Sequence, residues 1–269
     1  MYQYLGNTGI KMYDIFNLIS VIALLIMNMS MLKQKTEFLS AVSLRHIKRC
    51  RRKNKPRFVY NRYTVAFVEM FLISLVQYGF VSIFTMQFGK IMDTGRNYFS
   101  VLYFVPCLLM LLFYIIKISP IKQFDMITPA YAIALVFAKI ACFCSGCCNG
   151  IECEYGFYNA SSGLKEFPVQ LAEAAIVLCI FIFLLIYRKK AKNGTLFPVF
   201  LITYSAARFF LEFLRHEENI FLIFKTYHIL CIIGILLGIA EYYIAVKYGE
   251  KIIKFYNNRK IKDGYFRSM

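Results

Sequence analysis

The amino-acid sequence predicts an all-α integral membrane protein with seven transmembrane helices, and three observations lead to that prediction. Hydrophobic residues make up 59% of the 269 residues, and the mean hydropathy is +0.55. A soluble domain of this length does not bury so much apolar material. Several apolar runs reach the length of about 20 residues with which a helix crosses a bilayer. Basic residues concentrate in alternate connecting segments, which indicates a defined orientation in the membrane.

The seven predicted spans form a single membrane domain over residues 1–269. Their approximate limits are 15–32, 64–88, 98–116, 126–147, 169–187, 196–214 and 227–246. The first run lacks the basic leading region and the cleavage site of a secretion signal, so we expect it to be retained as a helix. Pro106 and Pro129 are expected to begin or kink helices, and Pro168 suits the first turn of the fifth span.

The distribution of charge predicts that the N-terminus lies outside the membrane and the C-terminus inside. The formal net charge is +17, which in a soluble protein would suggest a nucleic-acid partner. With an external N-terminus, the segments that face the cytoplasm hold 24 of the 32 Lys and Arg residues. These segments are 33–63, 117–125, 188–193 and 247–269. Because a positive-inside topology accounts for the charge, we expect no nucleic-acid partner.

Three connecting regions differ in composition. The cytoplasmic loop 33–63 contains the basic run RHIKRCRRKNKPR, and the cytoplasmic tail 247–269 is also basic. The outer loop 148–168 is instead rich in Gly, Asn and Ser, so we expect it to be structured.

Polar residues line one side of the sixth span. They are Tyr204, Arg208, Glu212 and Arg215, spaced by four, four and three positions, which places them on one stripe of a helix. A charge near mid-bilayer costs about 2.5–3.5 kcal/mol, so such residues usually face a bundle interior. Two guanidinium groups suit a phosphate that enters from the lipid headgroup layer. The alternative is an Arg208–Glu212 ion pair within the helix, with Arg215 extending to the outer interface.

Other spans supply further polar groups. Lys139 lies inside the fourth span, where a cation needs an anionic partner or a water-filled site. Gln170 and Glu173 begin the fifth span three positions apart, on a common face. Glu69 and Gln77 lie in the second span. Together with the sixth span these residues predict a polar pocket that opens toward the outer leaflet.

Five of the nine cysteines fall within residues 142–153. Cys144 and Cys147 form a C-x-x-C that could be a thiol redox pair, while a structural disulfide or plain buried thiols are the other interpretations. The stretch holds enough thiolates for a metal ion, but it lacks a second knuckle or a histidine pair, so we expect no metal and no cofactor. Gly146 and Gly150 would allow close backbone approach here.

The motifs that carry chemistry occur in a recognisable order. They are KIACFCSGCCNG (139–150), YG (155–156), FPVQLAE (167–173), NGTLF (193–197) and YSAARFFLEFLR (204–215). This order resembles the bacterial prolipoprotein diacylglyceryl transferases, and most closely the branch with a G-C-C-x-G segment. The resemblance extends over about residues 120–245.

The resemblance implies a seven-helix enzyme of the bacterial cytoplasmic (inner) membrane. Members of the family take the diacylglyceryl group from phosphatidylglycerol and attach it to the lipobox cysteine thiol of a preprolipoprotein. A thioether forms and glycerol phosphate is released. The partners implied for this chain are therefore phosphatidylglycerol and a prolipoprotein signal peptide.

The resemblance also implies roles for individual residues. Arg208 would bind the phosphate, Glu212 would orient it, and Tyr204 and Arg215 would complete the headgroup site. The catalytic set implied is Arg208, Glu212 and Tyr204, and the substrate-binding set is Lys139, Arg215, Gln170, Glu173, Gly146 and Gly150. Lys139 stands where the family has an Arg, which keeps the charge and loses the bidentate fork.

Several residues depart from the family pattern. A His-Gly-Gly segment proposed to carry the base has no counterpart near Tyr98 to Tyr103, and Phe167 replaces a His. Cys142 and Cys147 replace an Asn and a Glu. The group that activates the substrate thiol therefore stays open: Glu212, Tyr103 or none.

These departures leave other functions to consider. One is a diverged family member that binds phospholipid or a peptide without the standard reaction. Another is a membrane thiol-disulfide oxidoreductase that uses Cys144 and Cys147, although this gives no reason for the charges of the sixth span. A transporter is disfavoured because the sequence has no internal repeat and no paired broken helices.

Overall fold

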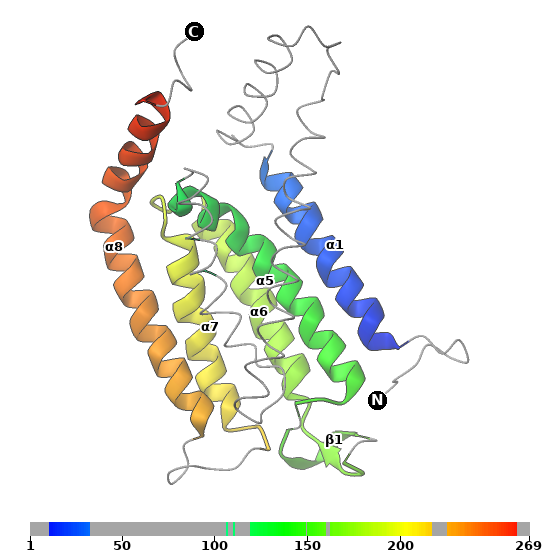
Figure 1. Cartoon of the computed structure of the whole chain (residues 1–269). Helices are drawn as coiled ribbons and strands as arrows, with labels where there is room; N and C mark the ends of the chain where they lie inside the picture. The colour runs from blue at the N-terminus through cyan, green and yellow to red at the C-terminus, as the bar shows by residue number, and fades with distance from the viewer. Residues whose placement is uncertain are drawn as a thin grey trace, which may run out of the picture. The chain divides into compact units, whose positions relative to one another are not determined.

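The computed structural model describes residues 11–32, 106, 110, 119–148, 150–159, 162–216 and 225–262. Within these residues the chain is mainly helical, with one small sheet (Figure 1). The helices are α1 (Met12–Leu32), α5 (Pro120–Ser145), α6 (Val169–Tyr187), α7 (Leu196–Glu212) and α8 (Thr226–Lys262). The strands are β1 (Glu152–Tyr158) and β2 (Lys165–Glu166).

Each described helix corresponds to a predicted span, and α6 has the predicted limits. Three helical segments are long and apolar enough to cross a membrane: Gln123–Ser145, Val169–Tyr187 and Tyr227–Tyr256. The chain is therefore a multi-pass membrane protein. The predicted spans 64–88 and 98–116 lie outside the described residues, apart from Pro106 and Met110, so the count of seven and the orientation stay predictions.

Two expectations about connecting regions need correction. The tail 247–269 was expected to follow a span ending near residue 246, but α8 continues to Lys262 because no proline interrupts it. The outer loop 148–168 contains an antiparallel β1–β2 pair, which an all-α fold lacks. Aromatic residues in β1 favour an extended strand. Gly156 permits the pairing, because a Cβ there would lie 2.3 Å from the Glu166 carbonyl oxygen.

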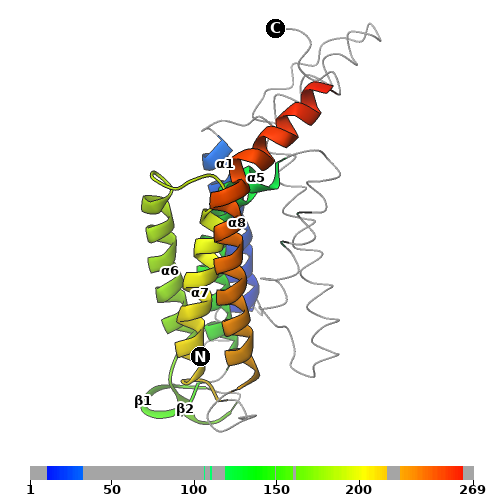
Figure 2. The ribbon, with the colours of Figure 1, turned by 90° about the vertical axis from the view of Figure 1, so that its left-hand side faces the viewer.

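The helices of residues 1–24 and 124–249 form one compact unit, which contains everything described below. α6 and α7 lie side by side in Figures 1 and 2. Along α5, three of the buried residues are small: Ala130, Ala132 and Ala141 are fully buried. Small residues let helix backbones approach closely in membranes. α1 is joined to α5 by the Ser20 hydroxyl, which donates to the Ala134 carbonyl at 2.7 Å.

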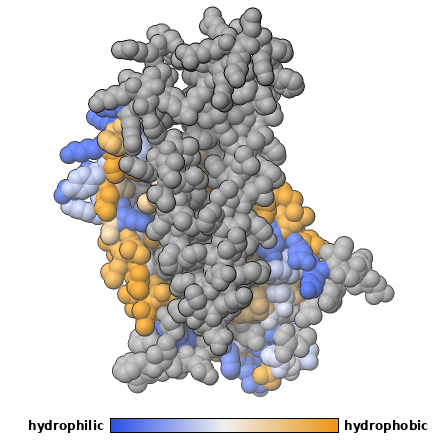
Figure 3. Space-filling model, in the orientation of Figure 1, coloured by the Kyte–Doolittle hydropathy of each residue, from blue (hydrophilic) through white to orange (hydrophobic). Residues whose placement is uncertain are grey.

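α8 packs against α7 through a glycine. A Cβ on Gly238 would lie 2.6 Å from Cγ1 of Ile202 and 3.1 Å from the Pro198 carbonyl oxygen. The remaining faces of the bundle carry apolar side chains, and Figure 3 shows them gathered along the side where α8 lies. Ile182 on α6 and Leu236 on α8 are 50% and 61% exposed. Apolar exposure on this scale is expected where a helix faces lipid.

Asp125 ties the start of α5 to the start of α7. Thr195, the N-cap of α7, makes no side-chain capping bond. The Asp125 carboxylate instead accepts the backbone N–H of Leu196 at 3.0 Å and that of Gly194. Gly194 has a φ of +88°, a left-handed conformation that turns the chain back from α6. A side chain from a distant helix thus satisfies the donors that a local cap usually satisfies.

We expect Asp125→Ala to lower the free energy of unfolding by about 0.5–2 kcal/mol, the usual cost of a lost helix cap. The measurement is the thermal denaturation midpoint of the purified protein in detergent. Asp14→Ala, an exposed acid in the first turn of α1, is the matched control and should leave the midpoint unchanged. Equal midpoints for both variants would contradict the capping role.

Candidate functional site

A cluster of buried polar side chains comes from the later turns of α5 and α7 and the first turns of α6. Figure 1 shows the β1–β2 pair beside these ends of the helices. The cluster draws on α5, α6, α7 and the segment that follows α7. The members are Lys139, Gln170, Glu173, Tyr204, Arg208, Glu212 and Arg215, and none is more than 7% exposed. The structure therefore brings together all the predicted site residues that carry polar side chains. The predicted glycines, Gly146 and Gly150, lie in the loop that follows α5.

Glu173 is the centre of this cluster. Its Oε1 lies 2.8 Å from Nζ of Lys139 and accepts the Tyr204 hydroxyl at 2.7 Å. Its Oε2 accepts Nη2 of Arg215 at 3.2 Å and lies 3.8 Å from Nη1 of Arg208. Three cationic groups from separate segments thus converge on one carboxylate that is 1% exposed.

A second ion pair lies within α7. Nη2 of Arg208 is 2.7 Å from Oε2 of Glu212, as their spacing of four residues predicts. The ion pair of the alternative interpretation is present, but Arg215 does not extend to the interface and instead donates to Glu173. Arg208 also approaches Glu173, and Arg215 is only 6% exposed.

The sequence analysis placed Arg215 on the polar stripe of the sixth span, but Arg215 lies beyond the end of that helix. α7 ends at Glu212, and Arg215 forms an isolated antiparallel bridge with Gly150. The backbone N–H of Ile151 donates to the Leu214 carbonyl at 3.0 Å. Gly150 is needed at this point, because a Cβ there would lie 2.1 Å from the Phe167 carbonyl oxygen. The outer loop therefore holds the guanidinium over Glu173.

Two buried residues of the site were missed by the sequence analysis. Nζ of Lys225, just before α8, donates to the carbonyl oxygens of Glu212 and Arg215, the first at 2.8 Å. His228 is fully buried beside Phe209, and its Nδ1 accepts the backbone N–H of Lys225 at 3.0 Å. One available signal was that Lys225 is a cation in a segment predicted to face outward, where the positive-inside rule makes cations uncommon.

The composition of the cluster favours an anionic ligand. Among the described residues it contains four cationic side chains, Lys139, Arg208, Arg215 and Lys225, and two carboxylates. Coulomb interactions are strong where water is scarce, so such a cluster attracts a negatively charged group. Oε1 of Gln170 and Oγ of Ser205 are buried without a hydrogen-bond partner in the described part of the chain. They could bond to hydroxyl groups of a ligand.

The end of α5 forms a tight turn that positions cysteines. Gly146 has a φ of +69° and its N–H donates to the Phe143 carbonyl, while the Cys147 N–H donates to the Cys142 carbonyl at 3.3 Å. This pair of bonds is the Schellman arrangement, which brings the third-last helical residue beside the second residue after the cap. Cys142 and Cys147 occupy those two positions.

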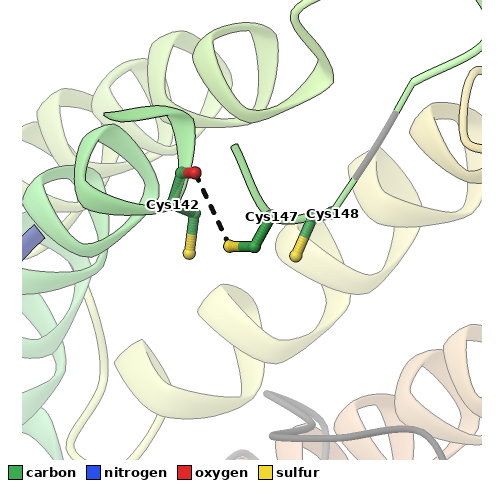
Figure 4. A group of neighbouring side chains, drawn as sticks. All are labelled: Cys142, Cys147 and Cys148. Carbon is green, nitrogen blue, oxygen red and sulfur yellow. Dashed lines mark hydrogen bonds between the residues drawn. The ribbon is translucent and has the colours of Figure 1, made fainter. Parts of the chain in front are cut away.

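Cys148 completes a thiol cluster with these two residues. The Sγ atoms of Cys142, Cys147 and Cys148 all lie within 4.8 Å of one another, and in Figure 4 the Sγ of Cys147 lies between the other two. Cys144, the other residue of the C-x-x-C, does not belong to this group, and Cys144 and Cys147 are both free thiols. The capping turn, and not the C-x-x-C spacing, decides which thiols meet.

The thiol cluster adjoins the charged cluster. Nε2 of Gln170 donates to the carbonyl oxygens of Cys147 at 2.6 Å and of Cys148 at 3.0 Å. Hydrogen bonds from Cys142 and Cys147 lower the pKa of the Cys148 thiol, and the charges of Arg215 and Lys139 lower it further. Phosphate-binding and thiol chemistry would thus operate at one end of the bundle.

We expect Glu173→Gln to destabilise the protein by about 3–5 kcal/mol, because it leaves buried cations without the carboxylate between them. The thermal denaturation midpoint of the purified protein in detergent measures this effect. Glu154→Gln, on the exposed part of β1, is the control and should have no effect. A midpoint in Glu173→Gln close to that of the unsubstituted protein would show that Glu173 does not hold the cluster.

Comparison with known proteins agrees with this geometry. A sequence model of the family described as prolipoprotein diacylglyceryl transferase matches residues 1–244. A phosphatidylglycerol–prolipoprotein diacylglyceryl transferase of Clostridium tetani is 33% identical over 107 residues, which is 37% of this chain and 43% of that protein.

Two further relatives carry similar names. The phosphatidylglycerol–prolipoprotein diacylglyceryl transferase 2 of Clostridium perfringens is 31% identical over 111 residues, 38% of this chain and 43% of that protein. The transferase of Chlorobaculum tepidum is 32% identical over 133 residues, 46% of each chain. The matched regions thus span a little under half the length of these relatives. Because the family match extends over most of its length, the chain belongs to the prolipoprotein diacylglyceryl transferase family.

Proposed function

We propose that this protein transfers a diacylglyceryl group from phosphatidylglycerol to the lipobox cysteine of a prolipoprotein in the bacterial cytoplasmic membrane. A thioether forms and glycerol phosphate leaves. The observation that carries the proposal is the convergence of Lys139, Arg208 and Arg215 on one buried site at the end of an apolar bundle. The names of the relatives, which specify phosphatidylglycerol and a prolipoprotein, support it.

The cationic groups suit the leaving group of this reaction. The substrate thiolate attacks the glycerol carbon that bears the phosphate, and the bond between that carbon and the phosphate oxygen breaks. The oxygen gains charge as the bond breaks, so donors fixed nearby stabilise the transition state more than the ground state. Arg208 supplies a planar fork that can hold two phosphate oxygens, and Arg215 and Lys139 add charge beside it.

The two carboxylates of the cluster, Glu173 and Glu212, hold the cationic side chains in place. Glu173 holds Lys139, Arg215 and Tyr204, and Glu212 holds Arg208. We therefore assign Tyr204, Glu173 and Glu212 positioning roles, in which they keep the cationic groups aimed at the phosphate.

Glycines and the Gln170 amide support the same site from the outer loop. Gly146 and Gly150 permit the turn and the close approach that bring the loop to α6 and to Arg215. The free Oε1 of Gln170 suits a hydroxyl of the glycerol headgroup. The contribution of Gly146 and Gly150 to substrate binding is thus indirect.

The carboxylates are poorly suited to remove the proton of the substrate thiol. Glu212 is 2.7 Å from Arg208, and Glu173 contacts Lys139 and Arg215. Each carboxylate is therefore already engaged by cationic side chains of the cluster. Tyr103, the other candidate base, lies outside the described residues.

We expect Arg208→Ala to lower the transfer rate by about 100-fold or more, the usual loss when a donor to a developing oxyanion is removed. Arg208→Lys should retain part of the rate, because it keeps the charge without the fork. The assay is transfer of labelled lipid from phosphatidylglycerol to a lipobox peptide in proteoliposomes. Lys190→Ala, in the exposed turn after α6, is the control.

Two results would contradict the proposal. One is full activity in Arg208→Ala, and the other is transfer from phosphatidylcholine as fast as from phosphatidylglycerol. Binding of phosphatidylglycerol without any transfer would favour the second candidate, a lipid-binding family member without the reaction. That candidate is favoured by Phe167, which stands where the family has a His, and by the missing His-Gly-Gly segment.

A further inference from the structure

The three thiols at the end of α5 have the spacing that one metal ion requires. Their Sγ atoms all lie within 4.8 Å of one another. In a tetrahedral zinc site with Zn–S bonds of about 2.3 Å, the sulfur atoms are about 3.8 Å apart. Small side-chain rotations of Cys142, Cys147 and Cys148 would therefore bring them to coordinating positions. Figure 4 shows the three sulfur atoms as neighbours, with that of Cys147 between the other two.

The backbone around the thiols is held by several independent contacts. The Schellman turn at Gly146 places Cys142 beside Cys147. Cys148 has a φ of +63°, a left-handed conformation that a cysteine rarely adopts. The Gln170 amide fixes the carbonyl groups of Cys147 and Cys148. Strain that persists in a fixed loop often marks a functional position.

Charge around the cluster suits a metal held by three thiolates. Three thiolates and one divalent zinc ion carry a net charge of about −1, and thiolate ligands are soft donors that select zinc over magnesium or calcium. The charged cluster, which contains Lys139 and Arg215, adjoins the thiols through the Gln170 amide and through the bridge between Gly150 and Arg215. Two cations beside a complex of negative charge stabilise it.

We propose that Cys142, Cys147 and Cys148 bind a zinc ion, and that its fourth coordination position receives the thiol of the lipobox cysteine. This inference rests on the proposed function and supplies the thiol activation that the carboxylates do not. Three protein ligands with one open position are the pattern of catalytic zinc sites. We expected no metal because the sequence lacks a second knuckle. That absence argues against a closed site with four protein ligands, but a site with three protein ligands and one open position does not need a second knuckle.

The step balances in atoms and charge. Zinc coordination releases the proton of the substrate thiol to solvent and leaves a bound thiolate. The thiolate sulfur forms a bond to the glycerol carbon, and the carbon–oxygen bond to phosphate breaks. The electron pair of that bond leaves with glycerol phosphate, which can take up the released proton. The thioether product is a weak zinc ligand, so it dissociates from the ion.

Cobalt substitution tests the metal site without any need for activity. The metal-depleted, reduced protein in detergent is titrated with Co²⁺, and we expect one equivalent to produce sulfur-to-cobalt charge-transfer absorption with tetrahedral visible bands. Zinc should abolish these bands by displacement. Cys142→Ser and Cys148→Ser should lose them, whereas Cys144→Ser and Cys179→Ser should retain them, since neither residue belongs to the cluster.

The same spectrum tests the open position. A lipobox peptide should shift the visible cobalt bands, and the same peptide with serine for its cysteine should not. No stoichiometric cobalt spectrum, or equal loss in Cys144→Ser, would overturn the metal site. If the lipobox peptide leaves the cobalt bands unchanged, the metal ion does not bind the substrate thiol.

A transfer assay separates this inference from the proposed function. Metal depletion and Cys148→Ser should both abolish lipid transfer, and zinc should restore it only to the depleted protein. Arg208→Ala should fail to transfer lipid and still bind cobalt. Full transfer by the metal-free protein would overturn the zinc step and leave the proposed function intact. No transfer by the zinc-loaded protein would refute the proposed function, while the cobalt spectrum would still decide the metal site.

Discussion

The site depends on one buried carboxylate. Glu173 is 1% exposed, and charged groups of three other segments contact it: Lys139 from α5, Arg208 from α7 and Arg215 after α7. A charge in surroundings of low dielectric constant must be paired, and cations gathered at one place need a carboxylate between them. Because each partner comes from a different element, this one interaction fixes how α5, α6 and α7 meet at the end of the bundle.

Contacts made by the outer loop connect the cluster around Glu173 to the three thiols. Gly150 pairs with Arg215, Asn159 donates to the Gly146 carbonyl at 3.3 Å, and Gln170 holds the carbonyl groups of the two cysteines after the turn. The loop that contains the β1–β2 pair thus connects the ends of α5 and α7. These contacts hold the cysteine turn beside Arg215, although both lie beyond the ends of their helices.

Two of the departures from the family pattern lie close together. The family's Asn and Glu are replaced by Cys142 and Cys147, and these thiols adjoin the retained Arg208 and Glu173 through Gln170 and Arg215. The part of the site that suits a phosphate therefore remains, while the part beside it has changed from oxygen and nitrogen donors to sulfur.

Sequence alone determined the features that depend on local periodicity. The limits of α6 follow from an apolar run between Pro168 and Arg188, and the Arg208–Glu212 pair follows from a spacing of four on one helix. Tertiary structure decided what depends on contacts between distant segments: Arg215 is held by the outer loop, and Lys225 donates to the carbonyl oxygens of Glu212 and Arg215. Helical repeats describe one segment at a time, whereas these positions are set by where separate segments end and meet.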